Sequence, residues 1–299
     1  MDWGQRIDRL RRWARDGERA PHKPLLLLYA LASHQAGITQ LPYRDVEPAL
    51  ALLLQDYGPP RPTSTAYPFH HLTSDGLWHV HTDTGPGSPG ATKTRLLDAN
   101  ATGSLAPDLL AALDTQPTLS RRLARQLLDV NFPASLHADI CLDLGLDLDT
   151  HLTATIDAAA ARRRGASHKL RDLVFTAYEY RCAFCGFDGL LGGRPVGLEA
   201  AHVRWWSHGG SDQLDNLICL CAIHHKLLDK GVFGISDDRR IMVSRKFVAR
   251  SPAGRQHVLD LAGQTMIEPQ PGSDLVHASH IRWHATQVFK DEGRTVSAR

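Results

Sequence analysis

Cysteines and a histidine in the second half of the chain have the spacing of a metal site. Cys182 and Cys185 form a Cys-x-x-Cys pair, and two thiolates at this spacing can bind one Zn²⁺. Cys221 and His224 repeat the spacing with a thiolate and an imidazole. Cys219 competes with Cys221, but its spacing to His224 is looser, so we favour Cys221. Four ligands leave no position for water, so this set predicts a structural zinc.

Between the two half-sites lies the segment GLEAAHVRWWSHGGSDQLDNLICLCAIHHKLLDKGVFGI, residues 197–235. The segment resembles the HNH endonuclease family, whose ββα-metal fold is a hairpin and a helix around one divalent cation. The signature positions of that family fall on His202, Asn216 and His225. The resemblance covers about residues 170–250 and implies a metal-dependent DNA endonuclease.

The chemistry of phosphodiester hydrolysis explains why these residue types are needed. The reaction requires a water, a base that accepts its proton, and positive charge on the transition state. The resemblance implies that His202, a neutral imidazole at a strand end, is the general base. It implies that His225 binds a catalytic cation, Mg²⁺ or Mn²⁺ or a similar ion, and that Asn216 fixes the loop that orients His202.

The segment departs from the family pattern at one position. Many members have an aspartate that ligates the catalytic metal immediately before the first histidine, and Ala201 occupies that position here. Side chains alternate along a strand, so Glu199 shares a face with Ala201 and is our candidate for the replacement ligand. His224 and His225 are adjacent on a helix, so we expect one to face the zinc and the other the active site.

The length of the chain favours two domains, because 299 residues is about twice the usual domain size. An alanine-rich run ends in RRRGAS, residues 162–167, and is the best candidate for a linker. We expect a DNA-reading domain over residues 1–160 and the nuclease domain over residues 161–299. The expected fold class is α+β: a mainly helical first domain with a small sheet, followed by a ββα-metal domain with its zinc site.

Charge is distributed unevenly between these two halves. The net charge is only +2, but residues 151–299 carry 20 basic against 15 acidic residues, whereas residues 1–150 carry 14 against 17. The positive excess therefore lies in the half that would bind a polyanion. No apolar run is long enough to span a bilayer, and the start lacks the apolar core of a signal peptide. We expect a cytoplasmic protein with no membrane partner.

Periodicity places several elements in the first domain. An amphipathic helix is expected over the first fifteen residues, and Pro24 and Gly37 suit the first turn and the end of a second, buried helix. Residues 67–83 are expected to form two short strands around a turn at Ser74, and residues 84–93 a loop. Further helices are expected at 47–56, 118–129, 135–143 and 168–180.

The start of the buried helix is a candidate phosphate site. A helix N-terminus presents unpaired backbone N–H groups and the positive end of the helix dipole. His22 and Lys23 stand at this position and would add side-chain donors. The alternative is a plain helix entrance with a surface lysine.

A second resemblance joins three segments of the first domain: PHKPLLLLYAL, YPFHHLTSDGLWHV and LLDVNFPASLHADI. Together they are similar to the sulfur-binding domains of modification-dependent restriction enzymes, which recognise phosphorothioated DNA. The similarity spans about residues 10–145. It implies that Tyr67 and Pro68, with His71 nearby, form an apolar cup for the sulfur atom. It implies that the surrounding phosphates are bound by Arg15, His22, Lys23 and Lys93. It also implies that the loop at 84–93 enters a groove and contacts bases.

Both resemblances together suggest a type IV-like restriction endonuclease that binds phosphorothioated double-stranded DNA and cuts nearby. Cutting both strands needs two active sites or two events, so a homodimer is plausible. One alternative is an HNH endonuclease directed at methylated DNA. A base reader would normally flip the base into an aromatic pocket, and aromatic residues are only 7% of the chain. The other is a non-catalytic DNA-binding protein with a degenerate nuclease domain, which the intact signature positions disfavour.

Overall fold

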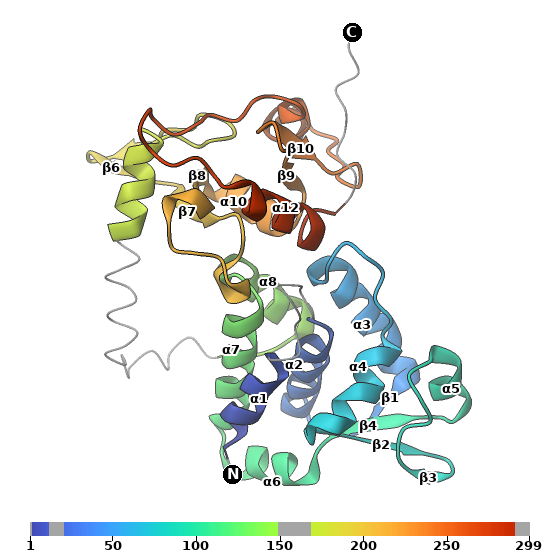
Figure 1. The fold of residues 1–299 in the computed structure, drawn as a ribbon. Helices are drawn as coiled ribbons and strands as arrows, with labels where there is room; N and C mark the ends of the chain where they lie inside the picture. The colour runs from blue at the N-terminus through green and yellow to red at the C-terminus, as the bar shows by residue number, and fades with distance from the viewer. Residues whose placement is uncertain (1, 12–20, 149–168, 291–299) are drawn as a thin grey trace. The chain divides into compact units, whose positions relative to one another are not determined.

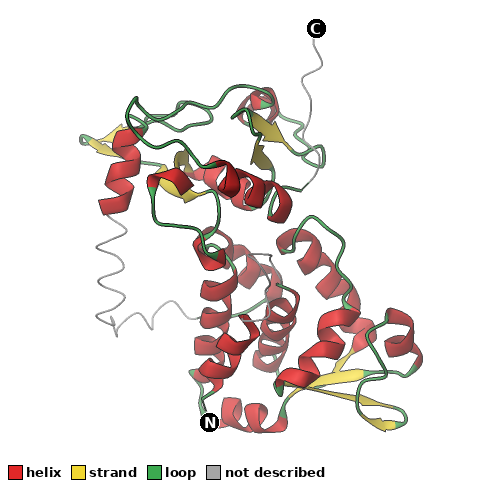
Figure 2. Ribbon diagram, in the orientation of Figure 1, coloured by secondary structure: helices red, strands yellow, loops and turns green. Residues whose placement is uncertain are grey.

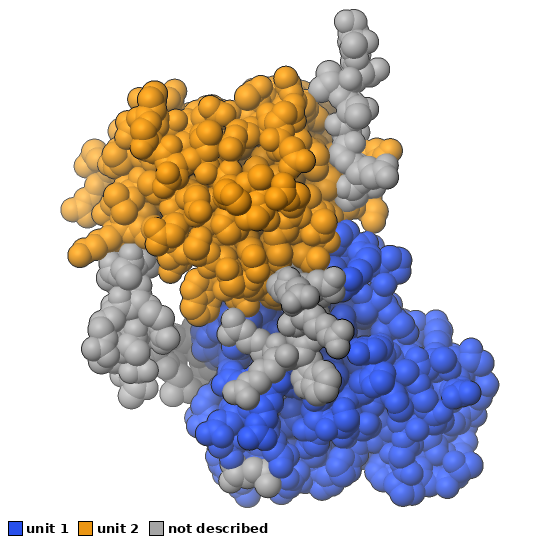
Figure 3. Space-filling model, in the orientation of Figure 1, with its two compact units in different colours: residues 1–150 blue, residues 151–299 orange. Residues whose placement is uncertain are grey.

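The computed structural model describes residues 2–11, 21–148 and 169–290. The chain divides into two compact units, residues 1–150 and residues 151–299 (Figures 1 and 3). The boundary expected at residues 160 and 161, like the linker at 162–167, lies outside the described residues and stays a prediction. None of the helices in the described ranges combines the length and hydropathy needed to cross a membrane.

Unit 1 is built around a central apolar helix, α2 (His22–Gln35), which packs against α3, α4, α7 and α8. Its residues Leu25–Leu28 are buried, as the all-round apolar sequence predicts (Figure 2 shows the helices in red). The other helices are α1 (Trp3–Arg11), α3 (Tyr43–Tyr57), α4 (Ala66–His71), α5 (Lys93–Asp98), α6 (Pro107–Thr115), α7 (Leu119–Asn131) and α8 (Ala134–Leu144).

A small antiparallel sheet completes unit 1, with strand order β1-β4-β2-β3. The strands are β1 (Leu41–Pro42), β2 (Trp78–Thr82), β3 (Gly85–Pro86) and β4 (Thr102–Leu105). Gly103 in β4 is required by the packing of the neighbouring strand, because a Cβ there would lie 1.9 Å from Trp78 Cζ2. The mainly helical domain with a small sheet expected from the sequence is therefore present.

The prediction of two strands over residues 67–83 is wrong in its first half. Residues 66–71 form α4, a short 3₁₀ helix (Leu72–Asp75) follows, and only the second segment is a strand, β2. Ala66, Phe69 and Leu72 are all fully buried, and their spacing of three residues is helical, not alternating. The loop expected at 84–93 contains the two-residue strand β3, and α5 begins at its last residue.

Unit 2 contains an antiparallel hairpin followed directly by a helix. Strand β7 (Leu198–His202) pairs with β8 (Leu217–Cys221), with Leu198 opposite Cys221 and His202 opposite Leu217. Helix α10 (Ala222–Asp229) starts at the residue after β8 and packs against both strands. This hairpin and helix are the ββα arrangement that the sequence predicts.

Further elements surround the hairpin. Residues 169–177 form a helix whose Val174 and Phe175 enter the same core as the inner faces of β7 and β8. The remaining elements are β5 (Leu190–Leu191), β6 (Arg194–Pro195), β9 (Phe233–Ile235), β10 (Ile241–Val243), α11 (Pro252–His257) and α12 (Ala278–Gln287). Helix α12 is tied to α10 through His284, whose Nε2 lies 3.1 Å from the Leu228 carbonyl oxygen.

Candidate active site and metal centre

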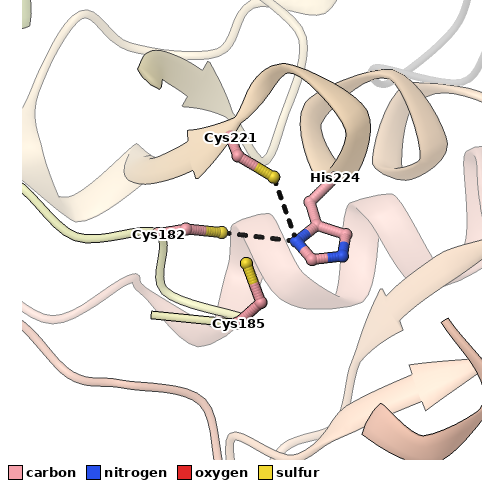
Figure 4. Close-up of side chains that lie close together, drawn as sticks. All are labelled: Cys182, Cys185, Cys221 and His224. Atoms are coloured by element: carbon pink, nitrogen blue, oxygen red, sulfur yellow. Dashed lines mark hydrogen bonds between the residues drawn. The ribbon is translucent and has the colours of Figure 1, made fainter. Parts of the chain in front are cut away.

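The expected zinc ligands lie together in unit 2. Cys182, Cys185, Cys221 and His224 each offer one ligand atom, and these atoms are within 4.8 Å of one another (Figure 4). His224 Nδ1 is 3.4 Å from Cys182 Sγ and 3.3 Å from Cys221 Sγ. Tetrahedral zinc, with Zn–S of about 2.3 Å and Zn–N of about 2.0 Å, would separate such atoms by about 3.5 Å. The cluster could therefore hold a zinc ion.

Hydrogen bonds orient His224 towards the cysteines and favour the charged form of Cys182, as cation binding would require. His224 Nε2 donates to the His257 carbonyl oxygen at 2.8 Å, which leaves Nδ1 facing the sulfur atoms. Hydrogen bonds from Cys185 and then from Cys221 lower the pKa of Cys182, although burial opposes this. The lowered pKa favours the thiolate of Cys182, the form in which a cysteine binds metal.

Cys219, the competing ligand considered above, is not a member of the cluster. It is fully buried in β8, and burial raises the pKa of its thiol to about 12, so the thiol stays protonated. The arrangement is consistent with the choice of Cys221.

His202 stands at the end of β7 beside the loop that joins the two hairpin strands. Its Nε2 donates to Asp212 Oδ1 at 2.8 Å. This hydrogen bond selects the tautomer with the proton on Nε2, so Nδ1 is the nitrogen left to accept a proton. The side chain is partly exposed, as access to a substrate requires.

Asn216 is fully buried and closes the loop between the strands. Its Oδ1 accepts from the Arg204 N–H at 2.8 Å, and its Nδ2 donates to the carbonyls of Arg204 and Ser211 at 2.9 and 3.0 Å. The loop is so tight that a Cβ on Gly210 would lie 1.8 Å from the Arg204 carbonyl oxygen. Asn216 thus holds the backbone that follows His202.

His225 lies between two carboxylates. Its Nδ1 is 2.6 Å from Glu199 Oε2, and its Nε2 is 3.2 Å from Asp229 Oδ2. Asp229 is buried and also accepts from Trp205 Nε1–H at 2.8 Å. Burial opposes the charged imidazolium, but the hydrogen bonds to Asp229 and Glu199 outweigh it and raise the pKa of His225 to about 10.

His225 Nδ1 and Glu199 Oε2 lie side by side, so both could bind one catalytic cation once that cation displaces the proton shared between them. Ala201 is buried and offers no ligand atom, so Glu199 is the carboxylate that meets His225. Two protein donors suit a cation of the Mg²⁺ class, which keeps several waters and takes the rest of its ligands from substrate phosphates. The adjacent His224 turns to the cysteines instead, so the two histidines face different sites.

Glu199 and His202 also line the same surface cavity, which has a volume of about 190 Å³. Glu199, which contacts His225, and His202, the candidate base, therefore border one cavity. This volume exceeds the share of about 30 Å³ that one water occupies, so the cavity has room for a larger polar group.

In unit 1, His22, Tyr67 and His71 form one group of rings. The His22 and Tyr67 rings are 5.6 Å apart, and those of Tyr67 and His71 are 4.3 Å apart. Burial, followed by the charges of Arg61 and Lys23, lowers the pKa of His22 to about 4. His22 is therefore neutral at neutral pH and can offer one ring N–H, not a positive charge.

The structure differs in one respect from the predicted apolar cup of Tyr67 and Pro68. Tyr67 is 45% exposed, but Pro68 is buried, so Tyr67 supplies the exposed apolar surface here. Lys23 lies beside the rings and forms an ion pair with Asp75 at 2.5 Å. The pKa of His71 is lowered by burial first, and then by the charges of His70 and Lys23.

Of the two remaining residues expected to bind DNA, the structure describes only Lys93, which does not join this group. Lys93 begins α5 and pairs with Glu47 at 2.8 Å. Arg15 lies outside the described residues.

Two site residues were not anticipated from the sequence. Asp229 lies four residues after His225 on the same helix, and this spacing was the available signal for their contact. Asp212 lies in the glycine-containing loop, where no periodicity indicates a partner for His202.

Comparison with known families assigns both units. Residues 2–149 match the ScoMcrA-like DNA sulfur-binding domain, and residues 182–236 match the HNH endonuclease family. Both resemblances inferred from the sequence are thereby confirmed. No curated protein matches the chain.

The solved structures similar to this chain include two sulfur-binding domains and a whole restriction endonuclease. The sulfur-binding domain of ScoMcrA complexed with phosphorothioated DNA is 25% identical, with a TM-score of 0.41, and the match covers 49% of this chain and 96% of that one. The sulfur-binding domain of SprMcrA in a similar complex is 22% identical, with a TM-score of 0.40 and coverages of 48% and 95%. The type IV phosphorothioation-dependent restriction endonuclease ScoMcrA is 24% identical, with a TM-score of 0.39. That match covers 49% of this chain and only 32% of the endonuclease. These TM-scores are low, so the assignment rests on the two family matches.

Proposed function

We propose that this chain, which joins a ScoMcrA-like DNA sulfur-binding domain to an HNH endonuclease domain, is a phosphorothioation-dependent restriction endonuclease. Unit 1 would bind phosphorothioated double-stranded DNA, and unit 2 would hydrolyse a phosphodiester bond nearby. The observation that carries the proposal is the presence of both domains on one chain. Solved relatives of the first domain are described in complex with phosphorothioated DNA.

The ring group of unit 1 has suitable chemistry for the modified phosphate. Sulfur is more weakly hydrated than phosphate oxygen, so contact with the exposed Tyr67 ring costs it less desolvation. A neutral His22 beside Tyr67 can donate a hydrogen bond to the modified phosphate. It carries no positive charge that would attract modified and unmodified phosphates alike. Lys23 and His71 adjoin this surface. In the proposal, Arg15 and Lys93 bind DNA phosphates.

In unit 2, His202 Nδ1 would accept a proton from the attacking water. The hydroxide adds to phosphorus, one P–O ester bond breaks, and the leaving oxygen takes up a proton. Asp212 holds the His202 ring through Nε2, and Asn216 fixes the loop that carries this pair. A divalent cation held by His225 and Glu199 would supply positive charge to the scissile phosphate.

The cysteine cluster would hold a structural zinc, with no direct part in the reaction. Its four protein ligands complete a tetrahedral shell, so no open position remains for water. The proposal thus includes two cation sites on adjacent histidines of α10. Two copies of the chain would allow both strands to be cut, so a homodimer belongs to the proposal.

Binding to three duplexes of one sequence tests the recognition step. One duplex is phosphorothioated, one carries methylated cytosine and one is plain. We expect the phosphorothioated duplex to bind at least about tenfold more tightly, a difference of about 1.4 kcal/mol. Tyr67→Ala should abolish this preference, whereas Leu52→Ala, which truncates another exposed apolar side chain of unit 1, should preserve it. Equal affinity for all three duplexes would exclude sulfur recognition, and preference for the methylated duplex would favour a base reader.

A nicking assay tests the hydrolytic step. We expect His202→Ala to slow cleavage of a phosphorothioated plasmid by about 100-fold or more with Mg²⁺ or Mn²⁺, because general-base catalysis is lost. Zinc content and the preference for phosphorothioated duplex should not change, since His202 is not a member of the cysteine cluster and sulfur recognition is assigned to unit 1. Cleavage at the parent rate would rule out His202 as the base.

A further inference from the structure

Arg171 is a basic residue beside the candidate active site that the mechanism above does not use. It lies on the helix formed by residues 169–177. Its guanidinium carbon is 4.9 Å from the centre of the Phe175 ring, one turn further along this helix. Phe175 is buried in the core of unit 2, so this cation–π contact holds the guanidinium in place.

The cavity beside the candidate base brings Arg171 to the reaction site. Arg171, Glu199 and His202 all line this space of about 190 Å³. Its other lining residues are apolar: Leu170, Leu198, Ala200 and Leu217. The guanidinium is therefore the positively charged side chain that borders the cavity shared by the base and the cation-binding carboxylate.

Arg171 differs from three other arginines of this unit in having no carboxylate partner among the described residues. Arg181, Arg239 and Arg240 each form an ion pair with a carboxylate. Within the described ranges, Arg171 forms no ion pair, and its buried Nε has no hydrogen-bond partner. Buried polar groups normally have a hydrogen-bond partner, so a buried donor without one, beside a cavity that Glu199 and His202 also line, points to an absent ligand.

We propose that Arg171 contacts the scissile phosphodiester through its guanidinium and stabilises the negative charge that develops there. The assignment rests on the proposed nuclease function of unit 2. A planar guanidinium donates two parallel hydrogen bonds to phosphate oxygens, so it suits this role better than an ammonium group. Because Phe175 already fixes the group, little reorganisation is needed when the phosphate charge increases.

The electrostatics of Glu199 agree with this position. Its pKa is lowered, mainly by the hydrogen bond from His225, and to a smaller extent by the charge of Arg171. The positive charge of the guanidinium thus lowers the pKa of Glu199 without a direct ion pair, which would neutralise the guanidinium. It remains available to an incoming anion.

Substitutions at Arg171, measured in the full chain, test the proposal. The readouts are single-turnover cleavage of phosphorothioated duplex, zinc content and melting temperature. We expect Arg171→Gln, which keeps a stem to pack on Phe175, to slow cleavage by about 100-fold. Arg171→Lys should recover part of the rate because it restores the charge without the planar pair of donors. Lys169→Ala removes an exposed cation from the same helix and should cleave at nearly the parent rate.

A second readout does not depend on cleavage. Duplex binding is measured at several salt concentrations without added divalent cation, so the DNA stays intact. Loss of one phosphate contact should reduce the slope of log affinity against log salt by about 0.9 for Arg171→Gln. Lys169→Ala should retain the parent slope.

The two readouts separate failure of this assignment from failure of the nuclease proposal. If the parent chain cuts no duplex, the nuclease function is wrong, and the salt slope still reports whether Arg171 touches phosphate. An unchanged slope for Arg171→Gln overturns the contact, whatever the cleavage rate. A zinc-loaded Arg171→Gln chain that cuts at the parent rate also overturns it.

Discussion

His202 and His225 are both imidazoles of the candidate active site, yet their hydrogen-bond partners differ. His202 meets one carboxylate, Asp212, at Nε2, and its Nδ1 is left to accept a proton. His225 meets carboxylates at both nitrogens, and their hydrogen bonds raise its pKa to about 10 against the opposing effect of burial. One ring is thereby arranged for proton transfer, and the other lies between two carboxylates, where a bound cation could replace its proton.

Asp229 should act as the positioning residue for His225. Asp229→Asn removes the charge that orients His225 through Nε2, so we expect the Mn²⁺ concentration for half-maximal cleavage to rise by about 10- to 100-fold. The measurement is a Mn²⁺ titration of cleavage, together with zinc content. Asp237→Asn, a substitution at an exposed aspartate of the same unit, is the matched control. An unchanged Mn²⁺ requirement for Asp229→Asn would contradict the assignment.

The lowered pKa of His22 has a consequence for stability against pH. The folded pKa of about 4 lies below the ordinary value of 6.5, so the unfolded chain binds the proton more readily between these values. The contribution of a neutral His22 is complete above pH 6.5 and is lost as the pH falls towards 4. The shift corresponds to about 3 kcal/mol.

Urea unfolding at neutral pH and near pH 4.5 measures this contribution. The parent should lose more stability on acidification than His22→Gln, whose side chain does not titrate. Equal losses in the two proteins would show that His22 is not buried in its neutral form.

At the scale of elements, α10 carries ligands for two different cations on consecutive residues. Successive helix positions point about 100° apart. His224 therefore faces the cysteines, and His225 faces Glu199 on β7. The cysteine cluster joins the residues before β5 to the end of β8 and the start of α10, and so fixes the helix that carries His225.

Zinc content should distinguish the ligands from their neighbour in β8. Cys185→Ser should lose most of the bound zinc and lower the melting temperature, because the metal shell loses one of four ligands. Cys219→Ala should retain about one zinc per chain, although it removes a buried thiol. Elemental analysis of the two purified variants makes the comparison, and zinc loss in Cys219→Ala alone would reverse the ligand assignment.

At the scale of the whole molecule, the chain forms two compact units, and the proposal assigns recognition to unit 1 and cleavage to unit 2 (Figure 3). Each unit has its own core: α2 is central in unit 1, and the hairpin with α10 is central in unit 2. The excess of basic residues lies in the second half, where general affinity for the DNA backbone would assist cutting.

Separation of the units should separate the two activities. Residues 1–150 have a core of their own, and we expect this fragment to keep the preference of at least about tenfold for phosphorothioated over plain duplex, since a compact domain can fold alone. The fragment should not cut. A folded fragment that has lost the preference for sulfur would show that recognition requires unit 2. Circular dichroism of the fragment checks that it is folded.

The sequence by itself was sufficient where local spacing decides the outcome. The Cys-x-x-Cys pair and the Cys221 and His224 pair were predicted from short-range spacing, and the hairpin followed by a helix from the resemblance to the HNH family; the structure contains all three. The buried character of α2 followed in the same way from its unbroken run of leucines. Such features depend on residues that are close in the chain, so their spacing limits their geometry.

Tertiary structure decided the contacts between distant segments. In helix α4, Phe69 packs on Tyr43 and Trp78, two rings from other segments of the chain, and these contacts could not be predicted from the sequence of residues 67–83. The proximity of Arg171 to Glu199 and His202 likewise joins a helix to a strand that begins more than twenty residues later. A side chain's pKa and partners depend on what surrounds it in space, and the order of residues along the chain does not specify those surroundings.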